Sequence, residues 1–223
     1  MRKQYPFFTP YVLISALLFL ALAYWGRWIS HPAAALNILG VDLPEYVKFV
    51  PEVRYGVIPV NRMVFFALPV SLSINLILFA SIKIRIPIWL RTIAAILAIP
   101  VALSMLPPAW TPGVLKTPEF LTQTLIIMAL MGAVFFTPLW HQIIPDRIRG
   151  VFLILTTLFP LPAVNAFYKL IPALEKLYHH DLHPGPGLYF LAMAEGLLVV
   201  VGVMLITTAS RTSSLISPAL HHE

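Results

Sequence analysis

Glu195 is the residue whose type and position most directly suggest chemistry. It interrupts the run from Leu182 to Ser210, which carries no other charged side chain. About seven residues separate Glu195 from the outer end of the helix expected at 188–209, so it lies roughly 10 Å deep at a rise of about 1.5 Å per residue. An ionisable side chain at that depth costs about 2.5–3.5 kcal/mol unless it is paired or hydrated. We therefore expect Glu195 to face the interior of a helical bundle or a water-filled cavity.

Asn165 is the predicted partner of Glu195, because it lies at a matching depth in the helix expected at 150–171. Lys169 follows one turn later, at i+4 from Asn165. Two interpretations stay open: a proton or cation site, or a structural hydrogen bond between helices that Gly196 allows to approach closely. Charged residues inside membranes are functional by default, whereas many polar residues only join helices.

A second polar pair, Ser71 and Asn75, shares one helix face at i, i+4 within the helix expected at 63–82. This pair either lines a polar cavity opposite Glu195 or satisfies the backbone that Pro69 frees and links two helices. The structural interpretation is favoured, because prolines in membrane helices usually need such compensation.

The concentrated metal-ligand candidates of the sequence are His179, His180 and His183, with Glu175 at i−4 from His179. Imidazole and carboxylate ligands on one helical face are typical of transition-metal sites. A looser alternative adds His31 and Asp42 from the outer side. The favoured interpretation is a solvated helix end before a Pro-Gly-Pro-Gly turn, so no cofactor is predicted and an outer-face metal ion stays the alternative.

The composition indicates a membrane protein. Of the 223 residues, 59% are apolar and 11% are charged, against roughly 25% charged residues in soluble domains. A soluble domain of this size could not bury so much apolar surface. The chain has no cysteine, which excludes thiolate catalysis and cysteine-ligated clusters. It also lacks a phosphate-binding glycine loop and the common hydrolase motifs.

Charge-free runs long enough to cross a bilayer predict an all-α polytopic bundle in a single membrane domain, 1–223. Six spans are expected, and five spans are the alternative, because prolines interrupt the third charge-free run. A signal-peptide cleavage site at Ala21-Leu22-Ala23 is the alternative for the first, although the aromatic continuation through Trp28 favours a retained helix with an interfacial anchor. The six spans are expected near 9–29, 63–82, 92–108, 120–140, 150–171 and 188–209.

The basic residues predict that both termini are cytoplasmic. The two short loops on that side, Lys83–Arg91 and His141–Arg149, carry five basic residues, whereas longer outer segments spread seven basic residues among six acidic ones. The long outer loop 30–62 is expected to be a connector at headgroup level, and 210–223 a short cytoplasmic tail. A bacterial or archaeal cytoplasmic membrane is the expected location.

A small permease, or an integral subunit of a larger membrane complex, is the favoured function. Catalysis needs an acid, a base and a further stabilising group. The sequence has a single deeply buried ionisable residue, so no catalytic residue is predicted. The alternatives are a membrane-embedded enzyme acting on a lipid or isoprenoid around Glu195 and Asn165, and an assembly factor. The expected partners are the lipid bilayer and other membrane proteins, and no nucleic acid.

Overall fold

The computed structural model describes residues 5–30, 37–84 and 86–214, with side chains described as far as 208. The chain is mostly helical, as the sequence predicted, and four helical segments of the described part are long and apolar enough to cross a membrane. They are Arg62–Ser81, Pro118–Phe135, Asp146–Tyr178 and Pro186–Thr208. Two shorter apolar helices, Thr9–Trp25 and Ile88–Leu103, complete the long elements.

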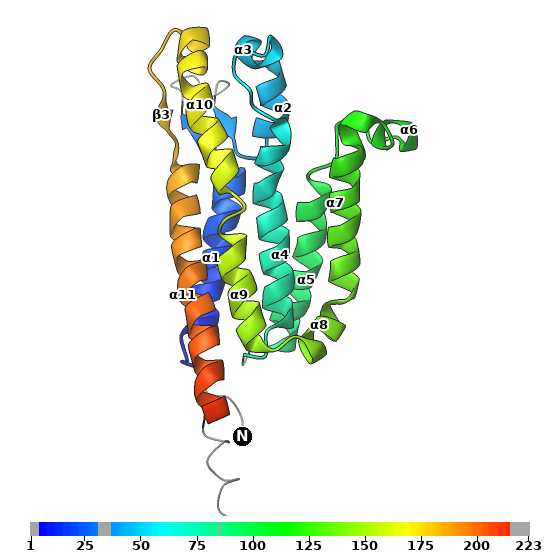
Figure 1. Cartoon of the computed structure of the whole chain (residues 1–223), viewed down its shortest axis with the longest axis vertical. Helices are drawn as coiled ribbons and strands as arrows, with labels where there is room; N and C mark the ends of the chain where they lie inside the picture. The colour runs from blue at the N-terminus through cyan, green and yellow to red at the C-terminus, as the bar shows by residue number, and fades with distance from the viewer. Residues whose placement is uncertain (1–4, 31–36, 85, 215–223) are drawn as a thin grey trace, which may run out of the picture.

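The long helices lie side by side along the longest axis of the molecule (Figure 1). Helix α11 packs along α1 and α9, while α4 separates this group from α5 and α7. Helix α1 begins, and α11 runs out, at the end of the bundle where α8 lies, which we call the terminal end. The bounds are α1 Thr9–Trp25, η3 Arg62–Phe66, α4 Ala67–Ser81, α5 Ile88–Leu103, α7 Pro118–Phe135, α8 Thr137–Ile143, α9 Asp146–Thr156, α10 Leu161–Tyr178 and α11 Pro186–Ser214.

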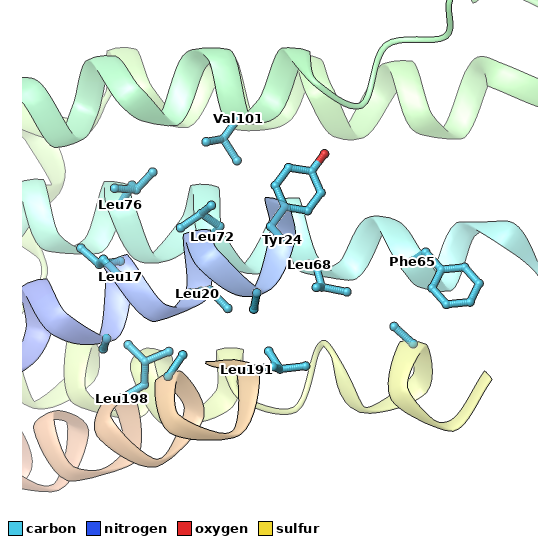
Figure 2. Packing of buried hydrophobic residues seen from close by; sticks show 14 of the residues in the cluster. Leu17, Leu20, Tyr24, Phe65, Leu68, Leu72, Leu76, Val101, Leu191 and Leu198 are labelled. Carbon is cyan, nitrogen blue, oxygen red and sulfur yellow. The ribbon is translucent and has the colours of Figure 1, made fainter. Parts of the chain in front are cut away.

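Buried leucines dominate the centre of the bundle. Figure 2 shows side chains of α1, α4, α5 and α11 converging between the ribbons. The side chains of Leu13, Leu20 and Leu68 are fully covered. The labelled members of this cluster are Leu17, Leu20, Tyr24, Phe65, Leu68, Leu72, Leu76, Val101, Leu191 and Leu198.

A break divides the segment Asp146–Tyr178 into α9 and α10, within the single span expected at 150–171. Pro160 explains it, because proline has no N–H and its ring clashes with the carbonyl group four residues earlier, that of Thr156. The turn tightens at this point, and the amide of Phe159 donates to the Thr156 carbonyl oxygen at 3.2 Å. Helix α9 therefore ends, and α10 begins, at a non-helical step near the middle of the bundle.

The opposite end carries a small head built from short elements. Its three-stranded antiparallel sheet has the order β2-β1-β3. These strands are too short to give a period-2 signal, and they were not predicted. The bounds are β1 Arg27–Ser30, β2 Ile38–Leu39, α2 Leu43–Tyr46, η2 Val47–Phe49, α3 Pro51–Arg54 and β3 His183–Pro184, with α6 Pro112–Leu115 between α5 and α7.

Trp28 lies inside the head, and the expectation of an interfacial anchor at Trp28 was wrong. Its side chain is fully buried. The indole N–H donates to the Ala23 carbonyl oxygen at 2.9 Å, so the polar edge needs no water. A Cβ atom at Gly187 would lie 2.8 Å from the Trp28 ring, which shows how closely the start of α11 covers the indole.

The described part of the outer loop, together with the start of η3, is tied to the bundle by ion pairs. Arg62 pairs with Glu45 at 2.8 Å, and Lys48 bridges Glu45 at 2.5 Å and Glu119 of α7 at 3.3 Å. The Arg62 guanidinium also lies 4.8 Å from the Phe120 ring centroid. These contacts anchor α2, η2 and η3 to the top of α7.

Candidate functional site

Glu195 lies near the middle of the apolar part of α11. The helix begins at Pro186, nine residues before it, so Glu195 is about 13 Å along the helix axis. The helix starts earlier than the expected position 188, because Pro186 itself occupies the first turn, where a missing N–H costs nothing. Glu195 is therefore slightly deeper than the sequence predicted.

The face of α11 that carries Glu195 is the face that meets α9. Gly202, two turns after Glu195, touches α9 so closely that a Cβ atom there would lie 2.7 Å from the Gly150 carbonyl oxygen. Gly150 also meets Ile206, while Ile154, one turn later, meets Gly202. The two helices therefore run antiparallel, and two turns before Gly202 brings Glu195 level with the break at 157–160.

The carboxyl group of Glu195 is enclosed but unsatisfied. Both carboxylate oxygens are buried and have no hydrogen-bond partner among the described residues. The residue as a whole is partly exposed, so its exposed portion does not include the carboxylate oxygens. A buried carboxyl without a partner is costly, and it is the outstanding functional candidate in the bundle.

The predicted partners of Glu195 lie elsewhere. Asn165 and Lys169 are exposed on α10, on the side away from the buried face that contains Ala166 and Leu170. Helix α10 packs against α4 and η3, whereas α11 packs along α1 and α9. The predicted pairing rested on depth counted along the sequence, and such a count carries no information about which way each side chain points.

Gly196 does not provide the expected close approach between helices. A Cβ atom at Gly196 would meet nothing within 4 Å. The close approach lies instead at Gly202 and Gly150, where backbone touches backbone. The expected close approach therefore occurs on the same helix, but later in the sequence, at Gly202 instead of Gly196.

Ser71 and Asn75 join two helices, in line with the structural interpretation of the sequence. The Asn75 amide donates to the Ser71 carbonyl oxygen at 2.8 Å, and its carbonyl oxygen accepts from the Thr156 hydroxyl at 3.1 Å. The Ser71 hydroxyl donates to the Thr156 carbonyl oxygen at 3.3 Å. All three side chains are buried. This network connects α4 to α9 immediately before the break.

The histidine segment forms a solvated helix end. His179 terminates α10 in the left-handed conformation with φ 52°, and His180 and His183 are exposed. The Glu175 carboxylate accepts a hydrogen bond from the Leu182 amide at 3.2 Å. Within the described ranges, no three His, Cys, Asp or Glu side chains are grouped so that they could hold a metal ion. His31 lies outside those ranges, so the looser arrangement with Asp42 is not described.

A buried ion pair at the terminal end escaped the sequence analysis. Asp146 and Arg149 pair with each other and are almost fully covered. Tyr5 donates to the second Asp146 oxygen at 2.5 Å, and Arg149 donates to the Trp140 carbonyl oxygen at 2.8 Å. Burial and the hydrogen bond to Asp146 both raise the pKa of Tyr5 above its usual value. The available signal was the i, i+3 spacing of opposite charges at the start of an apolar helix.

Comparison with known proteins identifies no relative. No protein-family description matches the chain, and neither a curated protein nor a solved structure does so.

Proposed function

We propose that the chain is a multi-pass membrane protein that crosses the bilayer six times, with both termini in the cytoplasm. In this proposal α1 and α5 are counted as spans in addition to the four long apolar segments. They have 17 and 16 residues, which is near the lower length limit of about 17 residues for a span. An even number of crossings is supported by the position of the two terminal helices, because α1 begins and α11 runs out at the same end of the bundle (Figure 1).

The proposed function is that of a small permease in which Glu195 binds the transported or coupling cation. One observation carries this proposal: the Glu195 carboxyl is buried about a third of the way along α11, level with the break between α9 and α10, and has no hydrogen-bond partner in the described part of the chain. Broken helices at mid-membrane depth are typical of transport sites. An intramembrane carboxyl that accepts and releases a proton or cation needs no further catalytic group.

The experiment is proton flux in liposomes that contain the purified full chain and an internal pH-sensitive dye, driven by a potassium diffusion potential. We expect Glu195→Gln to abolish the protein-dependent flux, because the amide cannot exchange a proton. Asp181→Asn is the matched control, since Asp181 is an exposed acid of the head. Wild-type flux equal to that of empty liposomes, or full flux in Glu195→Gln, would contradict the proposal. Size-exclusion chromatography of each variant establishes that it is folded.

A role as an integral subunit is the second candidate, and the surface of α7 favours it. Only 17% of the apolar window of α7 is buried, against 33% to 72% for the other long segments. Leu125, Met128 and Phe135 of α7 are exposed. Purification in mild detergent followed by mass spectrometry tests this candidate, which requires a stoichiometric membrane partner and fails if the chain is recovered alone.

A further inference from the structure

The surroundings of Glu195 determine how a ligand can reach it, if the permease role proposed above holds. Glu195 lies on the seam between α11 and the α9–α10 segment. Toward the terminal end this seam is closed by backbone contact, since the Gly202 Cβ position is 2.7 Å from the Gly150 carbonyl oxygen. Helices whose backbones are in such contact leave no space for a ligand between them.

Trp28 closes the same seam toward the head. Its ring packs edge-on against Phe167 of α10, with ring centroids 5.2 Å apart. It also covers Gly187 at the start of α11, where a Cβ atom would lie 2.8 Å from the indole. The indole therefore fills the space between α10 and α11 above Glu195. Both ends of the seam that face water are blocked by packed groups.

The third side of the seam between α11 and the α9–α10 segment faces outward from the bundle and is not blocked by packed helices. At the height of Glu195, Leu158 and Phe159 of the break are 54% and 40% exposed, and Val199 of α11 is 38% exposed. Gly196, adjacent to the acid, has open space around it. In a bilayer this surface meets acyl chains. Glu195 is itself partly exposed, whereas its two carboxylate oxygens are buried.

We infer that Glu195 binds the ammonium head of a lipophilic amine that enters sideways from the bilayer. The two unpartnered carboxylate oxygens accept N–H donors from a cation, and this pairing offsets the cost of a buried charge. The apolar body of the ligand then lies against Leu158 and Phe159. This inference rests on the proposed role of Glu195 as the cation-binding group and adds the class of ligand and its route.

The route is tested with two carbodiimides on liposomes that contain the full chain. Dicyclohexylcarbodiimide partitions into the bilayer, whereas a water-soluble, charged carbodiimide does not. In either reagent, a carbodiimide nitrogen takes up the carboxyl proton while the carboxylate oxygen bonds to the central carbon of the carbodiimide. The acyl group then migrates to nitrogen, which gives a stable N-acylurea without loss of atoms. We expect mass spectrometry to find Glu195 modified by the hydrophobic reagent alone, and the exposed Asp181 by the soluble one. Glu195→Gln removes the first modification.

The ligand class is tested by protection in the same assay. N,N-dimethyldodecylamine, a tertiary amine that forms no stable amide, is expected to slow modification of Glu195 at least fivefold. Its short analogue N,N-dimethylethylamine and uncharged dodecanol are expected to leave the rate unchanged. Equal modification by both carbodiimides, absence of modification, or equal protection by dodecanol overturns the inference. Normal proton flux without labelling of Glu195 by the hydrophobic reagent refutes the lateral route but not the permease role. Labelling and protection without proton flux refute the permease role but not the amine-binding site at Glu195.

Discussion

At the scale of single residues, hydrogen bonds that would be replaceable in water become structural inside a bilayer. Ser71, Asn75 and Thr156 satisfy one another where α4 meets α9. The surrounding acyl chains offer no donor or acceptor in exchange. Glu195 differs from this group because its oxygens have no partner among the described residues, and this difference separates a helix-joining contact from a ligand site.

Thr156→Val removes the hydroxyl donor to Asn75 and keeps the shape of the side chain. We expect it to lower the free energy of unfolding in detergent by about 0.6–1.7 kcal/mol, which spans the average and the largest value measured for hydrogen bonds between membrane helices. Thr207→Val is the control, because the exposed Thr207 hydroxyl donates only to carbonyl groups of its own helix, such as that of Val203. Equal losses in the two variants would show that the Thr156–Asn75 contact contributes nothing specific.

Arg149→Met leaves the Asp146 carboxylate buried without its main partner. Breaking a buried ion pair from one side costs about 3–5 kcal/mol, and we expect a loss of that size in the same unfolding measurement. Arg147→Met, an exposed arginine two residues earlier, is expected to change stability little. Replacing Asp146 with Leu in the Arg149→Met background is expected to recover part of the loss. An additive loss in the double variant contradicts a direct pairing.

The candidate site was only partly predictable from the sequence, for physical reasons. Glu195 was identifiable, because a charge within an apolar run is costly wherever it points. Its relation to Asn165 was not, since depth is readable from residue counts but the rotation of a helix is set by packing with other helices. Asp146 and Arg149 were taken for loop charges, because the covering residues, such as Tyr5, are distant in the sequence.

At the scale of elements, the contact between α9 and α11 sets the position of everything above it. Gly150 and Gly202 bring the two backbones together, and from this point α9 rises to the break beside Glu195. Charge-free runs predicted the helical membrane class, because their length is a direct requirement of the bilayer. The break and the small sheet gave no such signal. One proline often only kinks a membrane helix, and strands of two to four residues have no period.

Gly202→Ala and Gly196→Ala form a matched pair of variants on one helix. A Cβ atom at Gly202 would lie 2.6 Å from Ile154 Cγ1 and 2.7 Å from the Gly150 carbonyl oxygen. We expect Gly202→Ala to lower the unfolding temperature, because the backbone of α9 must move away. A Cβ atom at Gly196 meets open space, and alanine has a higher helix propensity than glycine by up to about 1 kcal/mol. We therefore expect Gly196→Ala to leave the unfolding temperature unchanged or to raise it. Equal effects would contradict the helix contact at Gly202.

At the scale of the whole molecule, charge is distributed unequally between the two ends of the bundle. In the sequence, the segments 1–8, 83–91, 141–149 and 210–223 carry eight basic and two acidic residues, whereas 27–62, 109–119 and 169–183 carry seven basic and six acidic residues. Short basic loops remain on the cytoplasmic side during insertion. This asymmetry supports a cytoplasmic terminal end and a head on the outer surface.

The absence of cysteine from the sequence makes orientation directly measurable. Single cysteines at Tyr55 in the head and at Gln142 beside α8 both occupy exposed positions. A membrane-impermeant maleimide is expected to label Tyr55→Cys in intact cells and Gln142→Cys only after permeabilisation. The unaltered chain serves as the unlabelled control. The reverse pattern would contradict the orientation, and labelling of both sites in intact cells would contradict a bundle that spans the membrane.

The most direct measurement of the central claim is the charge displaced by a rapid pH step across a supported membrane that contains the purified protein. A proton that binds at Glu195 moves part of the way through the low-dielectric layer, so it produces a transient current even without turnover. We predict such a current for the wild type and for Asp181→Asn, and its loss in Glu195→Gln. A wild-type membrane without a transient current, or an undiminished current in Glu195→Gln, would contradict a cation-binding carboxyl in the middle of the bundle.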